Sequence, residues 1–90
     1  MQTLATALID AAAFLELSGD DVIHQDDAVR ALESIGHTLR SASSAELSAI
    51  RAALSDLIAA ERAGRARADL LRFYEHFFES FGLSYEPVAS

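Results

Sequence analysis

The chain has no cysteine, lysine or tryptophan, and only one proline among its 90 residues. Without cysteine, neither a disulfide bond nor a thiolate metal site can stabilise the fold. A chain of this length forms one domain, whose core contributes only about 3 to 5 kcal/mol of net stability. We therefore expect association to supplement the core, and we predict a homodimer.

Positive charge is scarce and unevenly distributed. Seven arginines face fourteen acidic residues, which gives a net charge of −7, and arginine without lysine is typical of a GC-rich genome. This charge repels nucleic acid and anionic lipid, so we expect neither as a partner. Residues 1–29 contain six acidic residues and no arginine, whereas residues 62–72 contain four arginines. We expect these regions to attract each other or a second copy.

The N-terminal residues do not form a targeting signal. No basic stretch precedes the apolar run that ends at Leu17, and Asp10 interrupts that run. The run is also too short to cross a bilayer. The sequence therefore predicts a cytoplasmic protein.

Apolar residues recur at helical spacing throughout the chain, so we predict an all-α fold. The expected architecture is a small antiparallel bundle of three to four helices in one domain over residues 1–82. The helices are expected over residues 3–18, 25–42, from Ser43 to Gly64, and over residues 69–81. Ser43 and Glu46 have capping-box spacing, and a helix break at Gly64 is favoured over one long helix. Residues 83–90 should form a partly ordered tail, with Tyr85 packed back.

The first predicted helix is apolar on nearly all sides. Its main stripe is expected to face the core, while Phe14 and Leu17 extend the apolar surface around the helix. The residues assigned to the stripe are Leu4, Leu8, Ala11, Ala12 and Leu15. In the second helix, Ala28, Leu32, Ile35 and Leu39 are expected to face inward, with Val29 widening the stripe.

The last predicted helix has the clearest amphipathic pattern. At about 100° per residue, its large apolar side chains occupy one continuous arc. These residues are Leu70, Leu71, Phe73, Tyr74, Phe77, Phe78 and Phe81. Truncation of Phe77 or Phe78 should therefore unfold or dissociate the protein.

No residue set in the sequence is capable of catalysis. His37 and His76 fall on polar helix faces, and His24 falls at a helix start, so none is predicted to be a base or a metal ligand. The serines have no adjacent base. Asp20, Asp21, Asp26 and Asp27 lack the spacing of a calcium loop, and they are explained by solvation and by the positive end of a helix dipole. We expect no enzyme activity, cofactor or metal.

In size, acidity and helical content, the chain is similar to the small immunity proteins that block bacterial nuclease toxins, but it lacks their tyrosine-rich motifs. The leading hypothesis is a non-enzymatic interaction module of the immunity, antitoxin or adaptor type, with a basic protein partner and a second copy as its partners. Candidate partner-binding residues are apolar or acidic: Phe14, Leu17, Asp20, Asp21, Asp26, Asp27, Phe73, Phe77 and Phe78. The alternative is a carrier that holds a small ligand among the aromatic residues of the last helix, or a divalent cation at the acidic loop.

Overall fold

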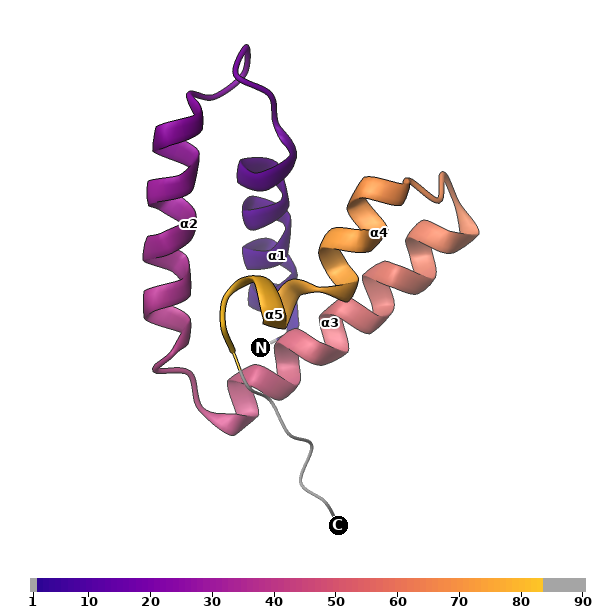
Figure 1. The fold of residues 1–90 in the computed structure, drawn as a ribbon. Helices are drawn as coiled ribbons and strands as arrows, with labels where there is room; N and C mark the ends of the chain where they lie inside the picture. Colours follow the sequence, from indigo (N-terminus) through magenta and orange to yellow (C-terminus); the bar gives the residue numbers. More distant parts are fainter. Residues whose placement is uncertain (1, 84–90) are drawn as a thin grey trace.

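The computed structural model describes residues 2–83, which form five helices and contain no strand (Figure 1). The helices are α1 (Gln2–Leu17), α2 (Gln25–Leu39), α3 (Ser44–Ala63), α4 (Ala68–Glu75) and α5 (Phe77–Ser80). The predicted all-α fold is confirmed. The predictions for residues 84–90, including Tyr85, lie outside the described residues.

The helices form two hairpins with α1 at the centre. Helices α1 and α2 run antiparallel, and α3 runs obliquely across them before α4 folds back along it (Figure 1). Helix α1 contacts α3 most extensively, and it also contacts α2 and α4. Most of the core is therefore built around one helix.

The face of α1 that enters the core differs from the predicted stripe. Ala5, Ile9, Ala12 and Ala13 are buried, whereas Leu4 is 74% exposed. Ala11 is also exposed, and Leu8 and Leu15 are half-buried. The predicted stripe is confirmed for Ala12 and wrong for Leu4 and Ala11, because a helix that is apolar all round does not fix its own rotation. Small side chains on the inward face allow neighbouring helices to approach closely.

Local hydrogen bonds set the boundaries of α2 and α3. The His24 side chain caps α2 by accepting a hydrogen bond from the Asp26 backbone N–H at 3.2 Å. The predicted capping box is confirmed, because Ser43 and Glu46 each accept a hydrogen bond from the other's backbone N–H. Helix α2 ends at Leu39 rather than at residue 42, since a turn is needed before this box.

The last predicted helix is interrupted at His76, which separates α4 from α5. The break redirects α5 toward α2 (Figure 1). The Phe81 ring, directly after α5, packs against Gly36 of α2. A Cβ atom on Gly36 would lie 3.2 Å from the Phe81 ring, so this glycine makes the close approach possible. The prediction of one continuous helix over residues 69–81 was wrong because helical periodicity does not reveal this change of direction.

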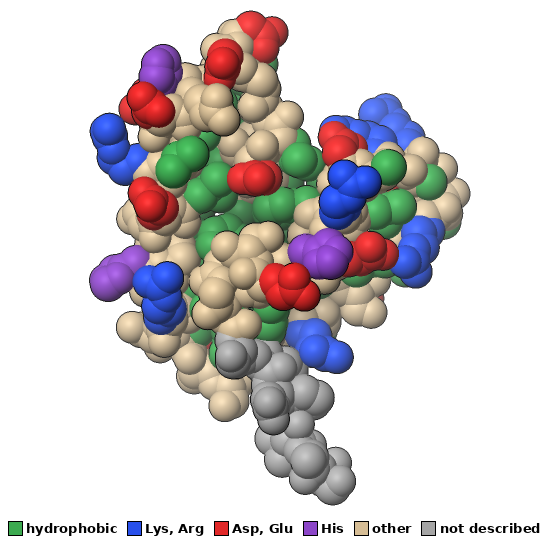
Figure 2. Space-filling model, in the orientation of Figure 1, with side chains coloured by type: hydrophobic (Ala, Val, Ile, Leu, Met, Phe, Trp, Pro, Cys, Tyr) green, Lys and Arg blue, Asp and Glu red, His purple; other side chains and the backbone are tan. Residues whose placement is uncertain are grey.

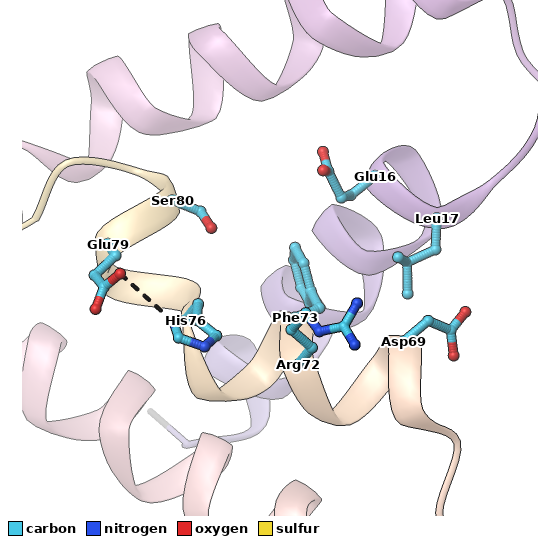
Figure 3. Close-up of a pocket in the computed structure, with 8 residues that line it drawn as sticks. All are labelled: Glu16, Leu17, Asp69, Arg72, Phe73, His76, Glu79 and Ser80. Carbon is cyan, nitrogen blue, oxygen red and sulfur yellow. Dashed lines mark ion pairs between the residues drawn. The ribbon is translucent and has the colours of Figure 1, made fainter.

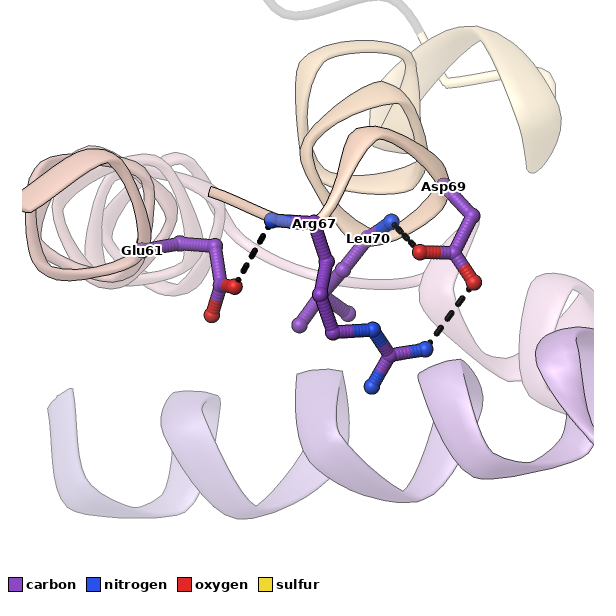
Figure 4. A network of polar contacts seen from close by, with 4 residues as sticks. All are labelled: Glu61, Arg67, Asp69 and Leu70. Atoms are coloured by element: carbon purple, nitrogen blue, oxygen red, sulfur yellow. Dashed lines mark hydrogen bonds and ion pairs between the residues drawn. The ribbon is translucent and has the colours of Figure 1, made fainter. Parts of the chain in front are cut away.

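A polar network directs α4 back along α3 (Figure 4). The Glu61 carboxylate accepts a hydrogen bond from the Arg67 backbone N–H at 3.0 Å. The Arg67 guanidinium in turn lies 2.9 Å from the Asp69 carboxylate. In the turn after Gly64, Ala66 has a positive φ of 52°, which is the left-handed backbone conformation that residues with a side chain rarely adopt. The predicted break at Gly64 is confirmed.

The aromatic core leads to a prediction about stability. Phe77 is fully buried, and its ring lies 5.7 Å from Phe73 and 4.8 Å from Phe81, measured between ring centres. We expect Phe77→Ala to cost about 3 to 5 kcal/mol and to abolish cooperative urea unfolding, followed by circular dichroism. Phe78→Ala should cost only about 1 kcal/mol because Phe78 is half-buried. Equal losses in the two variants would contradict this description of the core.

Candidate functional site

A groove crosses the face of the molecule between α2 and α4. Hydrophobic side chains gather in this hollow, with acidic side chains around them (Figure 2). Three adjoining hollows make up the groove, with volumes of about 510, 510 and 390 Å³. All three are lined by Glu16, so we call the surface the Glu16 groove. Its large apolar lining residues are Leu15, Leu17, Val29, Leu32, Phe73 and Phe81.

Glu16 occupies a position on α1 that favours an apolar residue. It follows Ala12 by four residues and Ile9 by seven, and both of these side chains have no exposed surface. The same helix face therefore leads from the core into the groove, where Glu16 is exposed. Glu16 also lies in the last turn of α1, where the helix dipole disfavours negative charge. Neither packing nor helix electrostatics explains a carboxylate at this position.

The close-up shows how the groove is assembled from distant segments (Figure 3). Glu16 comes from α1, Phe73 projects from α4, and Ser80 lies on α5. The imidazole of His76 lies 3.5 Å from the Glu79 carboxylate. The Glu16 carboxylate makes no hydrogen bond or ion pair with any other residue in the range 2–83. Among residues 2–83, therefore, no side chain pairs with this carboxylate, which is exposed to solvent.

The predicted partner-binding residues fall in four different environments. Leu17, Phe73 and Asp20 line the Glu16 groove. Phe14 is 54% exposed but lies outside the groove, on the outer face of α1. The remaining acidic residues of the set, Asp21, Asp26 and Asp27, are exposed in or next to the loop before α2.

The two remaining aromatic residues of the set do not line the groove, and Phe73, which does, is itself buried at 8% exposure. Phe77 has no exposed surface, so it supports the core and cannot contact a partner while the protein is folded. Phe78 is half-buried and packs against the core. Phe73 and Phe81 each pack against the Phe77 ring, and both also line the groove.

Neither the role of Glu16 nor the exposure of Val29 was predicted from the sequence, where Glu16 is only one of the six acidic residues among residues 1–29. Val29 was expected to widen the inward stripe of the second helix, but it is 48% exposed at the edge of the groove. Glu16 could have been identified from its register with Ile9 and Ala12, once the correct inward face of α1 was known.

The ionisable groups have mainly structural partners. A hydrogen bond from Arg67 holds the pKa of the Asp69 carboxyl below its ordinary value, and the same contact raises the pKa of Arg67. Hydrogen bonds from Ser43 lower the pKa of Glu46. Burial, followed by the charge of Asp10, raises the pKa of the Tyr74 hydroxyl. Each shift is explained by a cap, a turn or the core.

The three histidines lie apart from one another in the fold. His24 caps α2 through Nδ1, while His37 on α2 and His76 at the break between α4 and α5 are exposed and line the groove. Within residues 2–83, no three or more histidine and acidic side chains are grouped so that they could hold a metal ion. No described helix is both long and apolar enough to cross a membrane. The ion pairs of Arg62 and Arg67 are with Glu75 and Asp69, not with the acidic N-terminal third.

Comparisons with protein-family profiles, curated proteins and solved structures found no match to this chain.

The position of Glu16 leads to a prediction about stability. Glu16→Leu should raise the free energy of unfolding by about 1 kcal/mol, because leucine would continue the apolar face of α1 and cover part of the groove. Glutamate and leucine have similar helix propensities, so the change reports mainly on burial. Urea denaturation at neutral pH measures the effect. Asp10→Leu is the matched control, since Asp10 is exposed on the same helix outside the groove. A destabilised Glu16→Leu variant would show that the carboxylate supports the fold.

Proposed function

We propose that this chain is a non-enzymatic protein–protein interaction module of the adaptor or immunity type, which binds a basic protein partner through the Glu16 groove. The observation that supports this proposal most directly is the side chain of Glu16, which lines all three hollows of a groove with several apolar residues and has no partner within residues 2–83. A contiguous exposed apolar surface with a polar rim is typical of an interaction site. Acidic residues next to it would speed encounter with a basic partner and add specificity.

The positions of the ionisable groups favour binding over catalysis. General acid–base chemistry needs a base within hydrogen-bond distance of a nucleophile or a substrate proton, in a sheltered site. The His76–Glu79 pair is exposed, and His24 uses its Nδ1 atom as a cap. The chain's carboxylates and imidazoles therefore act in this proposal as charges and caps.

The first experiment replaces Val29 with the photo-reactive residue p-benzoylphenylalanine in the cells in which the protein occurs naturally. Irradiation should link the protein to one discrete partner of basic charge, because Val29 lies exposed at the groove edge. The same residue placed at Ala59, on the solvent face of α3, is the matched control and should give no such product. Gel analysis and mass spectrometry identify the product. Absence of a protein adduct at Val29, or equal labelling from both positions, would contradict the proposal.

A second surface supports self-association. The outer face of α1 carries Leu4, Ala7, Ala11 and Phe14, all exposed. Along the helix axis, these four residues are arranged symmetrically about the level of Ile9, which itself faces the core. Leu4 and Phe14 are equally far from Ile9 in sequence, and so are Ala7 and Ala11. An antiparallel pair of α1 helices would therefore place Phe14 of each copy on Leu4 of the other. The small alanines would allow close contact at the two-fold axis.

Sedimentation equilibrium tests this homodimer. We expect a dimer at high micromolar concentration, and we expect Phe14→Glu to be monomeric because it would place a charge in the apolar contact. The matched control, Ser55→Glu on the exposed side of α3, should remain dimeric. A monomeric wild-type protein would remove the self-association part of the proposal and leave the partner-binding part intact.

A further inference from the structure

The floor and the two long sides of the Glu16 groove are helical, and a loop lines one end. Helix α1 forms the floor, α2 contributes Val29 and Leu32, and α4 contributes Phe73. Consecutive hollows share lining residues and continue from the α4 side to the loop before α2. A small ligand would fill only one of the hollows. An elongated occupant would cover the whole apolar floor.

The charges around the groove favour a cationic group at its centre. Glu16 lines all three hollows, whereas Arg40 and Arg72 each line only one. The side chain of Glu33, which lines the groove from α2, also makes no hydrogen bond or ion pair within residues 2–83. Asp20 adds a further carboxylate at one end. An exposed carboxylate beside apolar side chains can form a charge-assisted hydrogen bond with an arginine or lysine, which is stronger than a hydrogen bond to a neutral group.

We infer that the Glu16 groove binds an amphipathic helix of the partner protein, with an arginine or lysine over Glu16 and apolar side chains against Val29, Leu32 and Phe73. This inference rests on the proposed function and specifies the chemistry of the partner. Helical walls present no unpaired strand edge within residues 2–83, so an extended segment would find no backbone pairing there. A helix satisfies its own backbone hydrogen bonds and presents apolar side chains at three- and four-residue intervals.

The experiment selects binders to the folded full-length protein from two displayed libraries. One library varies the surface of a single helix on a rigid helical scaffold, and the other varies an extended peptide of equal length. We expect enrichment from the helical library. The selected helices should have apolar residues at i, i+3 or i+4, and i+7, with an adjacent arginine or lysine.

Affinities of the selected helices are then measured by fluorescence anisotropy. Glu16→Gln should weaken binding about tenfold, since one charge-assisted contact is lost. Asp10→Asn removes the same charge from α1 outside the groove, so it should weaken binding less than twofold. Circular dichroism confirms that both variants remain folded. Nuclear magnetic resonance shifts on binding should centre on residues 16–17, 29–33 and 73.

Several outcomes would overturn the inference: enrichment only of extended peptides, selected helices without a basic residue, equal binding to wild type and to Glu16→Gln, or full affinity for N-acetyl-arginine amide alone. If cross-linking at Val29 still identifies a protein partner, these outcomes remove only the helical, cationic binding mode. If the selected helices behave as expected but no partner is cross-linked in cells, the groove chemistry stands and the proposed function fails.

Discussion

The burial of Ile9 and Phe77 is the packing constraint on which the rest of the structure depends. Among residues 2–83, these are the two large side chains with essentially no exposed surface, one on α1 and the other on α5. A chain of 90 residues can enclose few such side chains, because its ratio of surface to volume is high. Helix α1 must therefore contact α2, α3 and α4 through one narrow face that is rich in alanine. Beyond the core, the same face becomes the floor of the groove.

Much of the fold follows from local signals in the sequence. The ends of α3 could be predicted because Ser43 and Glu46 form a complete capping box and because Gly64 ends the helix. The rotation of α1 could not be predicted, since apolar residues surround it and only the helices packed against it select the buried face. The break at His76 also depends on tertiary contacts, because Phe81 must reach the space left by Gly36. The candidate site was missed for the same reason, as Glu16 becomes unusual only when that face is known.

Glu16 shows how the groove differs from the remainder of the helix surfaces. Elsewhere the charged side chains cap helices, pair across turns or face solvent, as Glu46, Asp69 and Glu75 do. Glu16 instead interrupts a core-facing stripe at the unfavourable end of a helix dipole. Natural sequences depart from such local rules mainly where function requires it. In the proposed function, Glu16 would serve binding at a position where packing and the helix dipole favour an apolar or neutral residue.

The attachment of α2 has a consequence for the width of the groove. Among the described helices, α2 has extensive contacts only with α1, and it is otherwise secured by the Phe81 ring against Gly36. Its two ends are joined to the molecule by short loops. A helix held along one side opens at lower free energy than the central elements of a fold. In the proposed function, a displacement of α2 would therefore widen or narrow the groove for partner helices of different diameter, while α1, α3 and α4 keep their positions.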